Sequence, residues 1–409
     1  TLGLRHNFKG SSRYSFDEIN SGKHEGSWST TVMDYTGINI RMPGFGEAQG
    51  KYSADGIGPY DYWAIEYGYG SGDLEKLLAE SSDPDHQYGT DEDAFGPDPT
   101  VRRYDMGSDP LTFAENQVAF AKHIRANLLD KFVKDGDSWS RARRGYLISL
   151  SQQTQVVSMM ANWVGSAYVY RDKKGDPGDR APIQAVEAER QRQAMQFVID
   201  NTFNDDAYGL SPELLTHITS DKWWDMGNDV LADPAMPIHD RILGLQASAL
   251  TMLLNPSTLQ RVYDYQMFVQ DGQDVFTLAE LLDAVTEGAW SEIDEAPSKK
   301  YSDKSPMISS LRRNLQMEHL DRMIDLSMAS DGFSAAQKPV RSLSAMHLRA
   351  IKDKADKVLE SAGKLDAYTR AHLQEVSLRI EKALDADYIY NVSDMGGGSH
   401  MFFTLGQAD

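Results

Sequence analysis

The pattern of hydrophobic and polar positions changes partway along the chain. In residues 1–72, glycine, tyrosine and serine are frequent, and turn-forming pairs such as Lys9-Gly10 and Pro43-Gly44 recur. This texture predicts loops with short helices. After Pro110, apolar residues recur at intervals near three and four, which is the spacing of an amphipathic helix. The chain is therefore expected to be mainly α-helical, with a loop-rich beginning.

The helical pattern continues almost to the end of the chain. It predicts a helix that begins near residue 111, and helices within 143–170 and 183–203. Further helices are predicted at 212–220, 239–254, 257–268, 276–287, 306–329 and 341–386. The polar segment 292–305 contains Pro297 and several lysines, so it is a candidate boundary inside the helical region.

An acidic segment, residues 73–110, separates the two textures. It contains four prolines between Pro84 and Pro110 and has little apolar periodicity. We expect a surface connector or a cation-binding loop. Its carboxylates could bind calcium through hard oxygen atoms, although their spacing does not match a twelve-residue calcium loop and a solvated charge run explains them as well. The candidates are Asp91, Glu92, Asp93 and Asp98. Three parts are therefore expected: 1–72, the connector 73–110, and a helical domain 111–409.

Composition narrows the classes of function. The 409 residues include 61 acidic and 41 basic side chains, and the net charge of −20 argues against nucleic-acid binding. The sequence contains no apolar run of about 18 residues, so no membrane span is expected. It also contains no cysteine, so a bound metal would need His, Asp, Glu or Tyr ligands. Cysteine avoidance is compatible with a periplasmic or secreted bacterial protein.

The first residues match the end of a zinc-peptidase signature. In the pattern HExxHxxGxxH, two histidines one helical turn apart and a third histidine beyond a glycine bind zinc, and the glutamate acts on the metal-bound water. The opening "TLGLRHNFKGSS" places Gly3 at the glycine and His6 at the third histidine. The spacing Gly-x-x-His alone is common, so the interpretation depends on residues further along the chain.

Three further stretches follow along the chain, and the first two stand in the order that such enzymes show after the third histidine. They are "TTVMDYTG" with Met33 and Tyr35, "GPYDYWAIEYGY", and the acidic "YGTDEDAFGPDP". With the opening, they resemble the metzincin-like family of large bacterial zinc-dependent peptidases called Met-zincins. The resemblance covers roughly the first 110 residues.

The resemblance implies a role for each matching residue. His6 would be the third zinc ligand, and Met33 would be the methionine of the Met-turn, the tight turn under the zinc site. Tyr35 would stabilise the oxyanion or act as a switch tyrosine, and Gly3 would be structural. Residues 1–72 would then be the C-terminal part of a metzincin-like catalytic domain, with a large helical region after it.

The rest of the signature is missing, because no H-E-x-x-H occurs in the sequence. We therefore expect a C-terminal fragment of a zinc endopeptidase that begins just after the HExxH. Its parent would be an enzyme acting on peptides or proteins, and the fragment alone would be inactive. The alternative is a non-catalytic helical interaction module that retains a relic of the signature. A sugar hydrolase with paired carboxylates is a third hypothesis, but no pair stands out.

Overall fold

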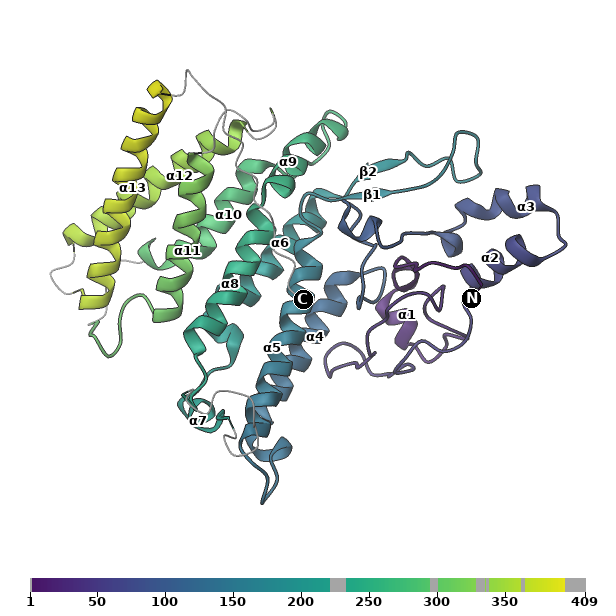
Figure 1. The fold of residues 1–409 in the computed structure, drawn as a ribbon, viewed down its shortest axis with the longest axis horizontal. Helices are drawn as coiled ribbons and strands as arrows, with labels where there is room; N and C mark the ends of the chain where they lie inside the picture. Colours follow the sequence, from purple (N-terminus) through teal and green to yellow (C-terminus); the bar gives the residue numbers. More distant parts are fainter. Residues whose placement is uncertain are drawn as a thin grey trace. The chain divides into compact units, whose positions relative to one another are not determined.

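The computed structural model describes residues 2–220, 233–294, 301–328, 335, 338–361 and 365–393, without the side chains of 361 and 386–393. Its internal contacts divide the chain into two compact units, Thr1–Thr277 and Leu278–Asp409. Helices dominate both units, and the sheet within the described ranges has two strands (Figure 1). The expectation of a mainly α fold is confirmed.

The first unit begins with loops and short helices, as the glycine-rich texture predicts. Ser15 starts α1 with a capping box, because its hydroxyl accepts from the Glu18 amide while the Glu18 carboxylate accepts from the Ser15 amide. The helical elements before residue 110 are η1 (Gly10–Ser12), α1 (Phe16–Asn20), α2 (Pro59–Tyr69), α3 (Leu74–Ala79), η2 (Glu80–Ser82), η3 (Pro84–His86) and η4 (Asp93–Phe95).

The later part of the acidic segment is packed against the start of the chain. Val101 and Ala94 form a small buried cluster with Phe8, and Met106 is fully buried. The amide of Phe8 donates to the carbonyl of Gly89 at 2.7 Å. Parts of the segment 88–106 are therefore packed against residues 8–11, whereas Phe95 and Tyr104 in the same segment are exposed. Apolar periodicity could not show this, because these contacts come from irregular backbone.

Long helices make up the rest of the first unit. Helix α5 (Ser140–Ala161) packs against α4 (Pro110–Ala126), α6 (Ala188–Thr202) and α8 (Ile238–Leu254). Arg125, near the end of α4, is buried and donates to Ser149 and Gln153 of α5 and to the carbonyl of Ala207. The remaining elements are η5 (Leu128–Phe132), η6 (Asp205–Tyr208), α7 (Pro212–His217), α9 (Pro256–Tyr265) and η7 (Gln266–Phe268).

A short hairpin corrects two of the predicted helices. Strand β1 (Ala167–Val169) lies within the stretch 143–170 and pairs antiparallel with β2 (Ile183–Ala185), which opens the stretch 183–203. Helix α5 has already ended at Ala161, and Gly165 comes next with a φ of 64°, in the left-handed region that favours glycine. The hairpin therefore interrupts what the apolar pattern joined into longer helices.

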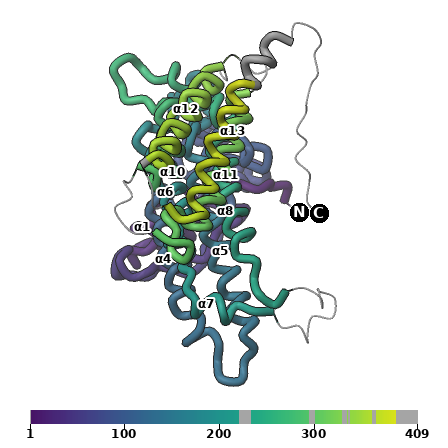
Figure 2. Tube along the Cα trace, turned by 90° about the vertical axis from the view of Figure 1, so that its left-hand side faces the viewer, coloured from purple at the N-terminus to yellow at the C-terminus, as the bar shows by residue number. Residues whose placement is uncertain are grey.

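The second unit is a helical bundle of α10 (Leu278–Trp290), η8 (Ser291–Asp294), α11 (Ser310–Ser327), α12 (Lys338–Ser361) and α13 (Ala367–Ser393). Helices α11, α12 and α13 contact one another and lie side by side (Figure 2). The single helix predicted over 341–386 is therefore two helices. Asp366 caps the second, because its Oδ1 accepts from the Thr369 amide at 2.8 Å. The segment 292–305 lies within the sequence of this unit.

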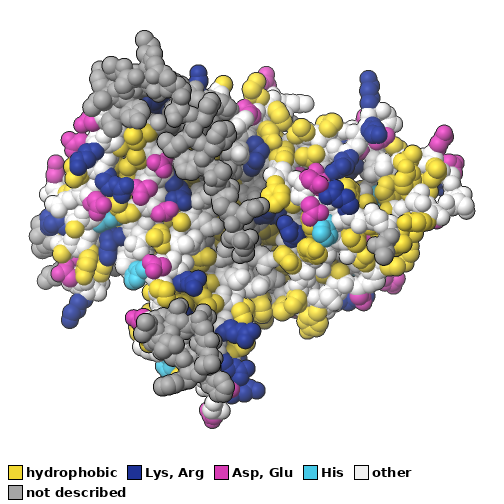
Figure 3. Space-filling view, viewed as in Figure 1, with side chains coloured by type: hydrophobic (Ala, Val, Ile, Leu, Met, Phe, Trp, Pro, Cys, Tyr) yellow, Lys and Arg dark blue, Asp and Glu magenta, His cyan; other side chains and the backbone are white. Residues whose placement is uncertain are grey.

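Charged side chains of both signs are interspersed over the face shown in Figure 3. Among the described residues, we find no helix that is both long enough and apolar enough to cross a bilayer. The sequence Gly-Ser-His-Met at 398–401 and the pair Phe402-Phe403 lie outside the described residues.

Candidate functional site

Backbone hydrogen bonds bring the beginning of the chain beside two distant loops. The amide of Asn7 donates to the carbonyl of Met33 at 3.1 Å. The side chain of Asn7 fixes the other loop, because its Nδ2 donates to the Gln87 carbonyl and its Oδ1 accepts from the Gly89 amide. Segments 6–9, 31–35 and 87–91 therefore meet, and His6 lies where all three come together.

Both ring nitrogens of His6 have partners. Nδ1 lies 3.0 Å from each carboxylate oxygen of Asp91, and Nε2 lies 2.9 Å from the hydroxyl of Tyr35. Because a carboxylate only accepts, we assign the proton to Nδ1, which leaves the lone pair on Nε2. The phenyl ring of Phe8 stacks on the imidazole with a centroid separation of 5.2 Å. The histidine is therefore held with a basic nitrogen directed at Tyr35.

The carboxylate beside His6 is stabilised in its charged form. The hydrogen bond from His6 lowers the pKa of Asp91, and the charge of Arg5 contributes in the same direction. Arg5 itself donates to both oxygens of Glu92, at 2.7 and 2.8 Å. Asp91 can therefore act as a permanent acceptor for the Nδ1 proton of His6, in the manner of the carboxylates that support metal-binding histidines.

Helix α2 anchors the turn at Met33 through the carboxylate of Asp61. Both oxygens of the buried Asp61 are used, since Oδ1 accepts from the Thr31 hydroxyl at 2.7 Å and Oδ2 accepts from the Val32 amide at 2.8 Å. The helix begins with a close approach to the turn, where a Cβ on Gly58 would lie 2.0 Å from the carbonyl oxygen of Thr30. Only glycine permits that approach.

A second buried carboxylate holds the other side of the turn. Oδ2 of Asp34 accepts from the amide of Ser11 at 2.8 Å, and the hydroxyl of Ser11 donates to Asp105 at 2.7 Å. Burial raises the pKa of Asp34 to about 7, and burial together with the charge of Asp34 raises the pKa of Asp105. The two carboxyls therefore prefer to carry at least one proton when the protein is folded.

The structure brings the four predicted site residues into one region. Tyr35 lies on Nε2 of His6, and the carbonyl of Met33 binds the amide next to His6. Met33 is half-buried, and its own amide donates to the hydroxyl of Thr31. Gly3, three residues before His6, has a φ of 80°, a conformation that disfavours any residue with a Cβ.

Zinc is the metal that the resemblance implies, and His6 fits it as a single ligand. An imidazole whose Nδ1 donates to a carboxylate presents Nε2 in the form that binds zinc. Within the described ranges, no group of three or more His, Cys, Asp or Glu residues lies close enough together to hold a metal ion. A zinc ion at His6 would therefore need ligands from outside the described residues.

The four acidic residues considered for calcium have different partners. Asp91 binds His6, and Glu92 binds Arg5. Asp93 pairs with Arg171 at 2.6 Å, and Asp98 pairs with the buried Lys9 at 2.7 Å. Because each carboxylate points to its own cation or imidazole, the described structure does not assemble them around a calcium ion.

The sequence interpretation missed three residues of this region. Asp34 and Asp61 lie inside the stretches "VMDY" and "PYDYW", so their proximity to the turn was visible although their burial was not. Asp91 was considered only as a calcium ligand. Its contact with His6 joins residues 85 positions apart, and nothing local in the sequence indicates such a pair.

Comparison with known proteins supports the same family. A family model described as Met-zincin matches residues 1–297, which include the whole of the site and all of the first unit. No curated protein matches the chain, and no solved structure does. Since the family model covers well over half of the sequence, the chain belongs to the Met-zincin family.

Proposed function

We propose that this chain forms the His6 side of the active site of a zinc-dependent endopeptidase. The observation that carries the proposal is the clamping of His6 between Asp91 at Nδ1 and Tyr35 at Nε2, beside the turn at Met33. An ordinary surface histidine would not need a carboxylate that fixes its tautomer. The metallopeptidase character of the family supports the same conclusion.

Each residue then has a defined task in peptide hydrolysis. Zinc, when bound, polarises the substrate carbonyl and makes a bound water acidic enough to attack it. His6 binds the metal through Nε2, and Asp91 keeps the proton on Nδ1. The hydroxyl of Tyr35 leaves Nε2 and donates a hydrogen bond to the oxyanion that forms on the substrate carbonyl. Met33 and Gly3 shape the backbone around the ligand.

In this proposal, an HExxH motif outside the 409 residues of this chain supplies the other two histidine ligands and the glutamate base. The sequence itself contains no such motif. The 409-residue chain alone is then expected to bind zinc weakly and to hydrolyse no peptide. We expect peptidase activity from a longer polypeptide in which HExxH stands directly before Thr1. That placement gives the complete spacing HExxHxxGxxH with Gly3 and His6.

The test compares zinc content and proteolysis of a denatured protein substrate for the two polypeptides. His6→Ala is expected to remove both zinc and activity from the longer polypeptide. The matched control is His123→Ala, because His123 is exposed on α4 and has no part in the site. Tyr35→Phe is expected to retain zinc and to lower kcat by about 10²- to 10³-fold.

Three results would overturn the proposal. Tight binding of one zinc by the 409-residue chain with His6→Ala would show that the ligands lie elsewhere. Full activity of His6→Ala in the longer polypeptide would exclude His6 as a ligand. A longer polypeptide that folds but neither binds zinc nor cleaves protein would favour the alternative, a helical interaction module with a relic of the signature.

A further inference from the structure

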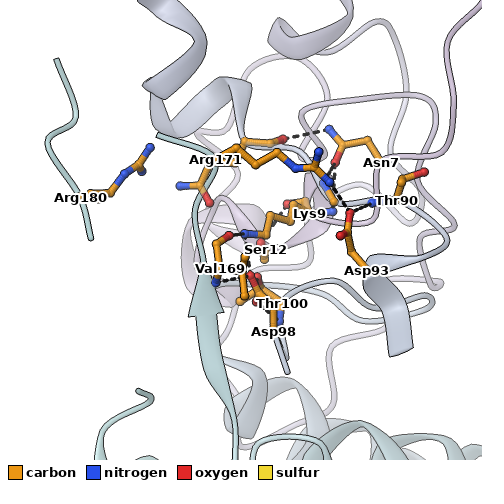
Figure 4. Close-up of polar contacts among 12 residues, drawn as sticks. Asn7, Lys9, Ser12, Thr90, Asp93, Asp98, Thr100, Val169, Arg171 and Arg180 are labelled. Atoms are coloured by element: carbon orange, nitrogen blue, oxygen red, sulfur yellow. Dashed lines mark hydrogen bonds and ion pairs between the residues drawn. The ribbon is translucent and has the colours of Figure 1, made fainter. Parts of the chain in front are cut away.

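A recess of about 230 Å³ lies beside the segment that carries His6. Helix α2 contributes Trp63, the loop before Asp91 contributes Tyr88, and the hairpin contributes Tyr170, Arg171 and Arg180. Lys9 also reaches the recess, between its contacts with Val169 and Asp98 (Figure 4). We call this the aromatic recess, and all of its residues belong to the first unit.

Stacked rings form much of the wall of the aromatic recess. Trp63 stacks on His86 with a centroid separation of 5.0 Å, and Tyr88 stacks on Tyr60 at 5.8 Å. The guanidinium carbon of Arg180 lies 4.5 Å from the centroid of the Tyr170 ring. These faces would accept the aliphatic or aromatic part of a ligand, because ring faces are apolar and pack at little entropic cost.

The charge of the aromatic recess differs from that of the whole protein. Its charged lining consists of three cations, Lys9, Arg171 and Arg180, and one carboxylate, Asp172, whereas the chain as a whole carries −20. Asp98 neutralises Lys9 in a buried ion pair of 2.7 Å, and Asp172 accepts two hydrogen bonds from Arg180. Arg171 is paired as well, with Asp93 at 2.6 Å, but its side chain is the most exposed of the three cations.

Arg171 has hydrogen-bonding capacity left over. Only its Nη2 is engaged, by Asp93 at 2.6 Å, and within the described part of the chain its Nε and Nη1 have no hydrogen-bond partner. The ring of Tyr88 lies against its guanidinium carbon at 5.0 Å, and the side chain is 57% exposed. Nε–H and Nη1–H lie on different edges of the guanidinium, so each can donate a charge-assisted hydrogen bond to a carboxylate oxygen of a ligand beside the Tyr88 ring.

The aromatic recess lies within reach of a peptide bound at His6. The side chain of Asn7 holds the segment 6–9 beside the segment 87–91. His6 and Asp91 meet at one end of these two adjacent segments. Lys9 and Gln87, at the other end, line the recess. Three residues of extended chain span at most about 10 Å. A substrate whose scissile bond lies at His6 could therefore place a side chain a few residues away into the recess.

We propose that the aromatic recess binds a carboxylate of the peptide substrate, seated next to an apolar side chain, with Arg171 as its main hydrogen-bond donor. The proposal rests on the proposed peptidase function and names a feature of its substrate. The overall negative charge does not prevent this, because at physiological ionic strength charges beyond about 8 Å are largely screened. The carboxylate could come from an acidic side chain or from a peptide C-terminus, and the experiment separates the two.

The experiment is isothermal titration calorimetry of the 409-residue chain with synthetic hexapeptides that contain one phenylalanine. One peptide, acetylated and amidated, carries glutamate beside the phenylalanine, and a second carries glutamine in its place. A third has glutamine and a free C-terminal carboxylate. We expect the carboxylate-bearing peptide to bind about tenfold more tightly than the neutral one, as befits a charge-assisted hydrogen bond. Whichever carboxylate source gives this gain identifies the natural one.

Arg171→Gln is expected to abolish the preference for the carboxylate, and Arg171→Lys to retain part of it. Arg141→Gln is the matched control, because Arg141 is similarly exposed at 60% and also pairs with an aspartate, Asp137 at 2.9 Å. Arg141→Gln is expected to keep the full preference. Circular dichroism establishes that each variant is folded.

The proposal is wrong if all three peptides bind equally, if none binds, or if Arg171→Gln keeps the preference. It is also wrong if inorganic phosphate displaces the glutamate peptide at equal concentration, since the recess would then be a general anion site. Because the titration needs neither zinc nor hydrolysis, peptide binding can fail while the zinc and proteolysis tests succeed, and the reverse also holds.

Discussion

The buried Asp34 predicts that the turn beneath the site becomes less stable as pH rises. Its Oδ2 accepts from the Ser11 amide, but within the described part of the chain its Oδ1 has no hydrogen-bond partner. Burial raises the pKa of Asp34 from 3.8 to about 7. The folded protein therefore binds a proton at Asp34 more tightly than the unfolded chain does.

Linkage determines the sign and the size of the effect. A carboxyl whose folded pKa is raised contributes stability that is fully present below the unfolded pKa and is lost as pH rises through the folded pKa. Between pH 4 and pH 8 the loss is about 4 kcal/mol, from a shift of roughly three units at about 1.4 kcal/mol each. Asp105, whose pKa is also raised, acts in the same direction.

Hydrogen exchange of the Ser11 amide, measured by mass spectrometry or NMR, reports on opening of this turn. After correction for the intrinsic rate, the wild-type opening constant is expected to rise by roughly 10²- to 10³-fold from pH 4 to pH 8. Asp34→Asn keeps the acceptor for the Ser11 amide and removes the titration of residue 34, so its opening constant is expected to change less, with Asp105 as the carboxyl that still titrates.

Asp130→Asn is the control, because Asp130 is an exposed residue beyond α4. It is expected to follow the wild-type pH profile. The new amide group of Asp34→Asn adds a donor at the unpartnered position, so the comparison concerns slopes with pH and not absolute protection. Identical slopes for wild type and Asp34→Asn would refute the reasoning.

Three further changes test other parts of the structure. Gly58→Ala is expected to lower the free energy of unfolding by about 1–3 kcal/mol, measured by thermal denaturation, because the new Cβ would meet the Thr30 carbonyl. Gly68→Ala, inside α2 with open space around it, is expected to raise it by up to about 1 kcal/mol. Equal effects of the two substitutions would contradict the close approach at Gly58. Asp91→Asn removes the carboxylate that accepts from Nδ1 of His6. It is expected to weaken zinc binding by the HExxH-bearing polypeptide about 10- to 100-fold, measured by competition with a chelating dye. An unchanged zinc affinity would show that Asp91 does not support His6 as a ligand. Burial lowers the pKa of His319 to about 3, so the stability it contributes above pH 6.5 is lost as pH falls toward 3. After correction for the intrinsic exchange rate, the hydrogen-exchange protection of the α11 amides is expected to fall on acidification, and protection that does not change with pH would disprove this.

The sequence predicted the long helices well because their apolar spacing is a local property. Helix α8 begins one residue before the predicted 239–254 and ends with it, and α10 is displaced from 276–287 by two or three residues. The hairpin was missed because strands of three residues are too short for alternation to be seen. The break before Asp366 was missed although Gly363, a poor helix residue, stands just before it.

The candidate site divides in the same way between local and distant information. Gly3 with His6, and Met33 with Tyr35, form short motifs that can be found by spacing alone. Asp91 contacts His6 across 85 residues of loops and short helices, where no periodicity indicates which residues will meet. The sequence therefore predicted the candidate ligand but not the carboxylate that orients it.

The site shows how irregular backbone can fix the orientation of one side chain, His6. Segments 6–9, 31–35 and 87–91 are largely loops, which usually open more readily than helices do. Here the turn at 31–35 is anchored through the buried carboxylates Asp34 and Asp61, and each binds backbone or hydroxyl donors from another segment. Because the chain's own residues make these anchors, the fold itself orients the Nε2 of His6, and binding requires little further ordering of the loops. The unfavourable burial of Asp34 is then part of what keeps the turn beside His6 in place.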